Sequence, residues 1–321
     1  MKFIFHAGQP PAHYQTFSTS LFNSPEHIAQ QGNNNVTLFE LVSEKNKMSY
    51  AQIWVFEKDK VAESPHKSSF GSFEFNPDLS LPELEKFINE VCKKLIHHKC
   101  HTFYIRSWPH CYNPAQFTIL HSALLQSGFT VKTTDLNFHL EINEKPFIDK
   151  IDSSEKWILN KCKKNKFYFD VLDPVKYLEE VYNFLSVSVR KHKDELSMSF
   201  FKLSDSFKQF PENYFLFGVF NNENKLLSAS VGVRINASIF YIFYLGYEVQ
   251  FSSFSPMVLL MEGIYNFCRE NKYEIMDLGI ATEKGVPNYG LIHFKRNLGG
   301  IAGFKLSYEK QLGIKENGYR V

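Results

Sequence analysis

Apolar residues recur along the first part of the chain at two spacings. After Ser80, and again after Asn113, they fall three and four positions apart, which predicts two amphipathic helices with one buried face each. Runs rich in β-branched and aromatic residues predict strands. These predicted strands lie at 36–43, 50–58, 101–108 and 129–142. Strands that alternate with helices predict a mixed α/β domain over this part of the chain.

The second part repeats this alternation of helices and strands. Its predicted helices begin at 153, after Asp173-Pro174 and after Ser255-Pro256, and its predicted strands lie at 213–220, 226–235, 238–247 and 273–279. Turn-forming residues separate the first three strands, so we expect these strands to be antiparallel neighbours. Both parts close with a similar order of elements. We therefore predict two tandem units, at 1–148 and 149–321, each a mostly antiparallel sheet flanked by helices.

The composition fits a folded, soluble protein. Of the 321 residues, 44% are hydrophobic and 22% are charged, as in globular domains. The net charge of +2, from 36 basic and 34 acidic residues, argues against a DNA-binding protein or another nucleic-acid-binding module, while a local basic patch stays open. Five cysteines without a CxxC pair, the lack of a signal peptide and the lack of a long apolar run predict a reduced, cytoplasmic protein without a membrane span.

A patterned stretch near the C-terminus gives the first indication of a family. A predicted strand ends at Asp277-Leu278-Gly279, a polar loop follows, and Gly290-Leu291 leads to Phe294-Lys295 and Leu298-Gly299. This order resembles the GNAT acyltransferase fold, and more closely the FemABX group, whose members carry two tandem GNAT-like domains. In the first part, SFGSFEF and HSALLQSGFTV resemble the N-terminal domain of that group. The resemblance spans most of the chain.

The resemblance implies an N-acyltransferase that takes an acyl group from acyl-CoA or aminoacyl-tRNA and gives it to an amine. The acceptor would be a small molecule or a cell-envelope precursor, and the only cofactor implied is acyl-CoA as a co-substrate, none being tightly bound. Lys295 would stabilise the anionic intermediate or the leaving group, and Asp277 would contact the acceptor amine. Two other interpretations stay open, namely that Asp277 caps the following loop and that Lys295 is a solvated surface lysine.

The resemblance also predicts where the donor binds. In the GNAT-like fold an acyl chain adds main-chain hydrogen bonds between two neighbouring strands, here those at 238–247 and 273–279. The N-terminus of the helix that follows the first of them attracts anions. The predicted donor-binding residues are Ser253, Phe254, Ser255, Met257, Asn288 and Tyr244. Ser255 and Asn288 also fit the alternative of helix caps.

Two departures from the GNAT pattern affect the donor prediction. The segment EVQFSSFSP has neither a glycine nor a basic residue, unlike the pyrophosphate loop of GNAT proteins that bind acyl-CoA. Phe294 stands where many GNAT enzymes have a tyrosine that protonates the leaving thiolate. Both departures favour the FemABX branch or, as the alternative, a catalytically inactive GNAT-fold protein that binds a ligand.

The remaining candidates lie outside this motif. Arg106, Trp108 and His110 follow a strand of the first part and are predicted to bind the acceptor. The stretch HHKCHTFYIRSWPHC around them is rich in histidine and cysteine, but its spacing matches no standard zinc module, so we predict a solvated helix end and no metal. The lysine-rich stretch 153–166 either touches phosphates of a donor or acceptor or forms a solvated helix face.

Overall fold

The chain divides into two compact units. The computed structural model describes residues 1–7, 13–32, 35–190 and 195–313. Of these, unit 1 contains residues 1–135, 284–286 and 304–313, and unit 2 contains residues 136–283 and 287–303. The division therefore differs from the single boundary predicted at 148/149, because it falls inside one long strand and because the C-terminal strand returns to unit 1.

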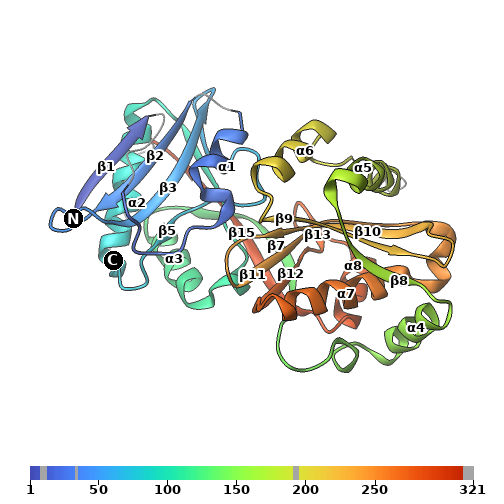
Figure 1. Cartoon of the computed structure of the whole chain (residues 1–321). Coiled ribbons are helices and arrows are strands. Elements are labelled where there is room, and N and C mark those ends of the chain that lie inside the picture. Colours follow the sequence, from blue (N-terminus) through green and yellow to red (C-terminus); the bar gives the residue numbers. More distant parts are fainter. Residues whose placement is uncertain (8–12, 33–34, 191–194, 314–321) are drawn as a thin grey trace. The chain divides into compact units, whose positions relative to one another are not determined.

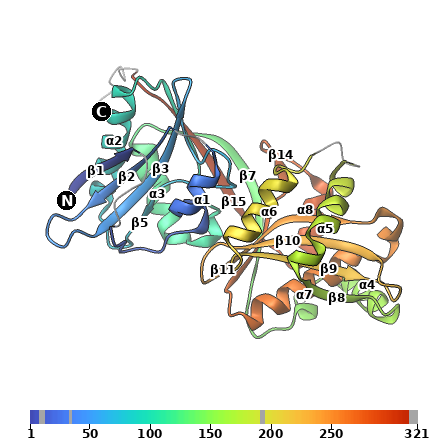
Figure 2. The same cartoon turned by 45° about the horizontal axis from the view of Figure 1, so that its top comes forward.

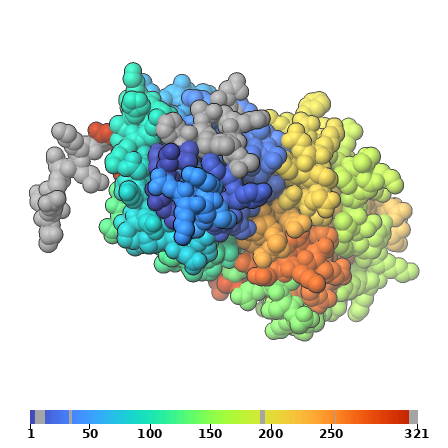
Figure 3. Space-filling view, turned by 60° about the vertical axis from the view of Figure 1, so that its left-hand side comes forward, coloured from blue at the N-terminus to red at the C-terminus, as the bar shows by residue number. Residues whose placement is uncertain are grey.

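Unit 1 is a sheet with helices packed on it. Its strands are β1 (Lys2–Ala7), β2 (Val36–Val42), β3 (Ser49–Lys58), β4 (Val61–Ser64), β5 (Glu74–Phe75), β6 (Thr102–Arg106), the first part of β7 (Thr130–Glu141) and most of β15 (Ile301–Gln311). They are hydrogen-bonded in the order β1-β2-β3-β4-β6-β15, with β5 also paired to β3. Within this series the β4–β6 pair is parallel and the other pairs are antiparallel. Figure 3 shows a face of this unit on which the N-terminal elements, in blue, lie in front.

The helices of unit 1 follow the predicted periodicity. They are η1 (Leu21–Asn23), α1 (Pro25–Gln30), α2 (Leu81–His97), η2 (His110–Tyr112) and α3 (Pro114–Gln126). The predicted apolar face of α2 is buried. Asn113 starts α3 because its side chain accepts a hydrogen bond of 3.1 Å from the Gln116 amide, and Pro114 supplies the backbone angle of a first helical residue.

Unit 2 repeats this plan with a second mixed sheet. Its helices are η3 (Phe147–Asp149), α4 (Ser153–Lys164), α5 (Pro174–Arg190), α6 (Phe200–Gln209), η4 (Val249–Phe254), α7 (Pro256–Glu270) and α8 (Tyr289–Asn297). Its sheet joins the second part of β7 to β12 (Ile275–Ile280), β11 (Ile239–Tyr247), β10 (Leu226–Arg234), β9 (Tyr214–Phe220) and β8 (Tyr168–Leu172), in that order. Two short strands, β13 (Thr282–Glu283) and β14 (Val286–Pro287), form a hairpin before α8. The β11–β12 pair is parallel and the other pairs of the large sheet are antiparallel.

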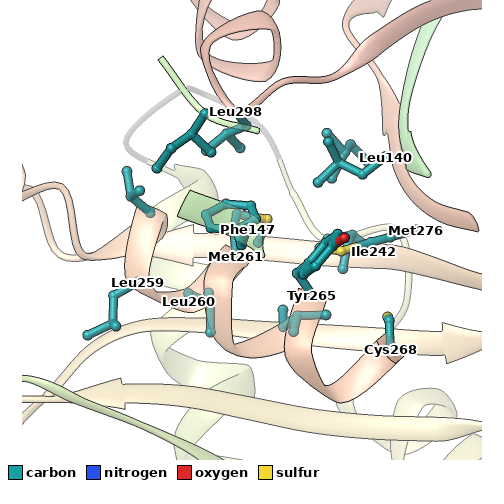
Figure 4. Packing of buried hydrophobic residues seen from close by; sticks show 14 of the residues in the cluster. Leu140, Phe147, Ile242, Leu259, Leu260, Met261, Tyr265, Cys268, Met276 and Leu298 are labelled. Carbon is teal, nitrogen blue, oxygen red and sulfur yellow. The ribbon is translucent and has the colours of Figure 1, made fainter. Parts of the chain in front are cut away.

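Helices cover both faces of the unit 2 sheet, with α5 on one face and α7 on the other (Figure 1). On the α7 face, Leu140, Ile242 and Met276 project from three neighbouring strands into a cluster with Tyr265 of α7 (Figure 4). In the turned view of Figure 2, α4 lies at the same end of the unit as α7. Each unit is thus a mostly antiparallel sheet flanked by helices, which confirms the predicted fold class.

Candidate functional site

The parallel strands β11 and β12 separate part-way along their length. Their pairing ends at Tyr241 and Asp277, after three residue pairs. Both strands continue beyond this point, β11 to Tyr247 on its partner β10 and β12 to Ile280 on its partner β7. Beyond Tyr241 and Asp277 the two strands are no longer paired with each other. Unpaired strand edges are the kind of position at which an extended chain adds main-chain hydrogen bonds.

A bulge on each strand accounts for this separation. The register of β11 against β10 skips Phe243, and the register of β12 against β7 skips Leu278. An extra residue bends a strand and increases its local twist. Leu278 directly follows the last paired residue of β12 and Phe243 comes two residues after that of β11, so both bulges bend their strands just beyond the end of the ladder.

Gly279 provides the backbone conformation that the β12 bulge requires. Its φ is +75°, a left-handed value that disfavours other residues. The Asp277 carboxylate stabilises this turn because its Oδ1 accepts a hydrogen bond of 2.8 Å from the Gly279 amide. The same oxygen accepts 2.9 Å from the side-chain amide of Asn137, on β7. Asp277 is only 1% exposed, so these donors replace the water that a buried carboxylate lacks.

Lys295 projects from the last turn of α8 to the same point. Its side chain is 5% exposed, and its ammonium donates hydrogen bonds to the carbonyls of Gly279, at 2.9 Å, and Ile280, at 2.8 Å. Both carbonyls belong to the part of β12 that has separated from β11. The interpretation of Lys295 as a solvated surface lysine is therefore wrong.

Burial changes the acid–base properties of Lys295. Loss of water around the ammonium lowers the pKa of Lys295 from an ordinary 10.5 to about 8, and the negative charge of Asp277 acts in the opposite direction. A cation with few water molecules around it interacts more strongly with a nearby negative charge than one on the surface does. Lys295 is thus a weakly hydrated cation that is still mostly protonated at neutral pH.

Tyr241 completes the surroundings of Gly279. A Cβ placed on Gly279 would lie 3.6 Å from the Tyr241 ring and 4.0 Å from Lys295 Nζ. The aromatic ring and the ammonium therefore flank the same glycine, at the level where the parallel ladder ends.

The segment before α7, which is predicted to bind an anion, already uses one of its main-chain amides within the protein. Ser255 occupies the N-cap position of α7 with a φ of 40°, but its side chain makes no capping hydrogen bond. Its amide already donates to the Ser252 carbonyl at 3.0 Å, so this donor is not available to a ligand in this conformation. The Ser253 side chain lies outside the described residues. Met257 lies in the first turn of α7, where main-chain amides have no partner within the helix.

Phe254 links this segment to α4. Its carbonyl accepts a hydrogen bond of 3.0 Å from Cys162 Sγ, and Lys161 Nζ lies 4.3 Å from the centre of its ring. The segment EVQFSSFSP has no basic residue of its own, yet α4 brings a lysine to its last aromatic ring. The sequence could not reveal this contact because the two residues are far apart in the chain.

Asn288 and Tyr244 make contacts within the protein. Asn288 caps α8, since its Oδ1 accepts 3.0 Å from the Leu291 amide. The Tyr244 hydroxyl lies 2.7 Å from Ser197 Oγ and accepts 2.9 Å from the Met198 amide, so it fixes the chain that leads into α6. Their predicted roles in donor binding stay predictions.

The three acceptor candidates all lie in unit 1. Arg106 ends β6 with an exposed side chain that donates 2.8 Å to the Ser68 carbonyl. Trp108 is 8% exposed and packs edge-on against Phe117, with 5.2 Å between ring centres. His110 contacts the same phenylalanine. Trp108 and His110 are thus brought together around Phe117, and the predicted acceptor contacts of all three candidates stay predictions.

The histidine- and cysteine-rich stretch is tied to a carboxylate. His98 Nδ1 lies 3.0 Å from both oxygens of Glu57, and the Cys100 thiol donates to one of them at 3.5 Å. Burial and this carboxylate raise the pKa of Cys100 to about 12, which disfavours the thiolate that a metal needs. Among the described residues, no three histidine, cysteine or acidic side chains gather as a metal site.

Solved structures of other proteins share the overall fold of this chain. FemX superposes with a TM-score of 0.64 at 11% identity, over 86% of this chain and 87% of that one. L-PGS from Bacillus licheniformis gives 0.56 at 12% identity, over 92% and 89%. A tandem GNAT protein from the clavulanic acid biosynthesis pathway gives 0.53 at 8% identity, over 98% and 100%.

This chain has a GNAT-like fold related to that of FemABX proteins. The similarity is one of structure, because no protein-family model and no curated protein sequence matches the chain. In this GNAT-like fold, β11, α7 and β12 form the strand–helix–strand unit of the second domain, and Lys295 approaches it from the next helix, α8. No helix in the described ranges is both long and apolar enough to cross a bilayer.

Two features of the site were missed from the sequence, and a third was not distinguished from its neighbours. Asn137 lies in a strand, β7, that carries many polar and charged residues, so the sequence gives no signal that Asn137 is the one with a buried partner. The Phe243 bulge has no signal, because the run 239–247 is apolar and aromatic throughout. Tyr241 is one of several tyrosines in that run, and only the register of β11 identifies it as the one beside Gly279.

Proposed function

We propose that this chain is an acyl- or aminoacyltransferase that acts on an amine. The observation that carries the proposal is the end of the β11–β12 ladder at Tyr241 and Asp277, with the buried ammonium of Lys295 at the same point. A sheet that opens between two parallel strands offers main-chain groups to the donor's amide or peptide-like chain. A fixed cation at that opening offers stabilisation to charge that develops on the reacting group.

The reaction assigns one role to Lys295. The acceptor amine attacks the carbonyl carbon of the donor, and the carbonyl oxygen becomes an oxyanion. The oxyanion then collapses, the C–O or C–S bond to the donor breaks, and the proton that the amine loses passes to the departing oxygen or sulfur. An ammonium has three N–H groups, and two of those of Lys295 are held by Gly279 and Ile280. The third donates to the oxyanion or to the leaving atom. Removal of one such donor typically costs about 100- to 1,000-fold in rate.

Asp277 acts mainly as a positioning residue. Its carboxylate holds the Gly279 turn and opposes the effect of burial on the Lys295 ammonium. Because it is 1% exposed, a direct contact with the acceptor amine requires that amine to reach the base of the opening.

The segment before α7 favours aminoacyl-tRNA over acyl-CoA as donor. A pyrophosphate needs several free main-chain amides at close range. Here the Ser255 amide is already bonded to Ser252, and the segment has no glycine that would allow a close approach. An aminoacyl ester does not place a pyrophosphate at this position.

A donor panel tests the proposal. The purified chain is incubated with an amine panel and with either acyl-CoA or mixed aminoacyl-tRNA, and amide products are detected by mass spectrometry. We expect products from aminoacyl-tRNA, and a loss of about 100-fold or more in Lys295→Met. Lys310→Met is the matched control, because Lys310 also donates to a main-chain carbonyl, that of Ser127 in unit 1. Equal rates in Lys295→Met and wild type would refute the role of Lys295.

The alternative is a ligand-binding protein without catalysis. One observation favours it, namely that Lys295 already has two main-chain partners, as a purely structural lysine would. That alternative predicts donor binding by calorimetry without product, and equal donor affinity in wild type and Lys295→Met.

A further inference from the structure

Helix α4 exposes lysines and a tryptophan on its outer side. Its buried residues, Glu155, Leu159 and Cys162, face inward, and α4 packs on α7. The outer residues are one large aromatic and several lysines. We call them the α4 basic face, made of Lys156, Trp157, Lys161, Lys164 and the following Lys166.

The α4 basic face carries a net positive charge. The only carboxylate among residues 153–164 is Glu155, which is 7% exposed and accepts from Asn297. The neighbouring Lys163 is neutralised by Glu262, at 2.8 Å, and is therefore not counted in the face. The exposed acidic residue next to the face is Asp152, the N-cap of α4, and the four lysines of the face outnumber it. Such a face complements a polyanion.

Trp157 adds a second type of contact. Its side chain is 64% exposed although tryptophan is usually buried. Lys161 Nζ lies 5.3 Å from the centre of its ring and 4.3 Å from that of Phe254. The ammonium thus lies between two aromatic rings, one on the exposed face and one directly before α7. The α4 basic face is therefore continuous with the segment where the donor is expected.

We propose that the α4 basic face docks the RNA part of an aminoacyl-tRNA donor. Lysine ammonium groups pair with phosphates, and an exposed tryptophan stacks on a base of a single-stranded end, which is the end that carries the aminoacyl group. This inference rests on the proposed transferase function and adds the surface that selects the donor class.

A membrane surface fits the α4 basic face less well. A helix that lies in a bilayer interface has a wide apolar stripe on its outer side. On α4 the exposed positions beside Trp157 are polar, including Ser153 and Asn160. A single aromatic ring among lysines fits a nucleotide better than it fits lipid.

The test measures binding of deacylated tRNA to the full chain by fluorescence anisotropy at several salt concentrations. We expect Trp157→Ala to weaken binding about tenfold, the usual loss of one stacked base. We expect the double variant Lys161→Gln, Lys164→Gln to weaken binding and to reduce the slope of log affinity against log salt by about 1 to 2. The matched controls are Phe201→Ala and Lys208→Gln on α6, an exposed aromatic and an exposed lysine of another helix, which should bind as wild type does.

Two results would overturn the docking surface. One is wild-type affinity for tRNA in both α4 variants. The other is binding to phosphatidylglycerol vesicles that depends on Trp157 and Lys164 while tRNA is not bound, which would assign the face to a membrane.

The docking and transfer proposals fail in different ways. If transfer from aminoacyl-tRNA occurs and the α4 variants leave its KM unchanged, the docking surface is wrong and the transferase stands. If tRNA binding depends on the α4 basic face but no donor yields product, the transferase is wrong.

Discussion

Folding stability should depend on pH through Lys295 in a direction opposite to that of an ordinary ion-paired lysine. In the folded chain burial lowers the pKa of Lys295 to about 8, whereas in the unfolded chain the side chain returns to 10.5. Between these values the unfolded state binds more protons than the folded state, so the free energy of unfolding rises with pH. Below pH 8 both states are protonated, and the cost of burying the ammonium is fully present.

The size of this effect follows from the two pKa values. From pH 7 to pH 10, the Lys295 contribution to the free energy of unfolding should increase by about 2.5 kcal/mol. Other groups titrate in this range as well, so the measurement compares wild type with Lys295→Met, which has a similar length and no charge. Urea unfolding of both proteins at each pH gives the difference, in which the shared groups cancel.

The free energy of unfolding of wild type minus that of Lys295→Met should increase as the pH rises. At pH 7 the two proteins should have similar stability, because Met removes the buried charge but leaves the Gly279 and Ile280 carbonyls without their donor. A difference that stays constant from pH 7 to pH 10 would mean that Lys295 keeps an ordinary pKa and is hydrated in solution.

The other predictions concern the packing around the site. Gly263→Ala should lower the free energy of unfolding by about 1–3 kcal/mol, because the added Cβ would overlap the Phe169 ring. Thermal unfolding measures this change, and an unchanged Tm would show that the Phe169 ring can move aside. Gly279→Ala should lower the free energy of unfolding by about 1–2 kcal/mol, because alanine is strained at a φ of +75°, and it should also lower the transfer rate. A wild-type transfer rate would show that function does not depend on this turn. Asn137→Ala should lower the free energy of unfolding by about 1–3 kcal/mol, because the buried Asp277 carboxylate loses a hydrogen-bond donor. Wild-type stability in urea unfolding would contradict that hydrogen bond.

The elements that formed as predicted are those in which local pattern and tertiary packing agree. Helix α2 buries the predicted apolar face, and the three-strand meander of unit 2 matches the predicted runs closely. Helix α6 and strand β8 were not predicted. The β8 sequence YFDVL is short and lies at the edge of the sheet, so most of its side chains keep solvent contact and give no clear alternation.

The functional geometry was less accessible from the sequence. The motif around Lys295 indicated the residue but not its partners, because the Gly279 and Ile280 carbonyls are main-chain groups. Two units were predicted, but their bounds differ from the prediction, since β15 returns to pair with β6 and so joins residues near the end of the chain to unit 1. Contacts over such sequence distances leave no local pattern.

The Phe243 bulge has a consequence for protein engineering. On β11, Ile242 faces the α7 core, whereas Gly246, at the same parity, faces Leu185 of α5. The extra residue therefore exchanges the α7-facing and α5-facing positions half-way along the strand. A mutagenesis library that assumes simple alternation would assign residues beyond Phe243 to the wrong face of the sheet, so it should be designed in two halves with opposite phase.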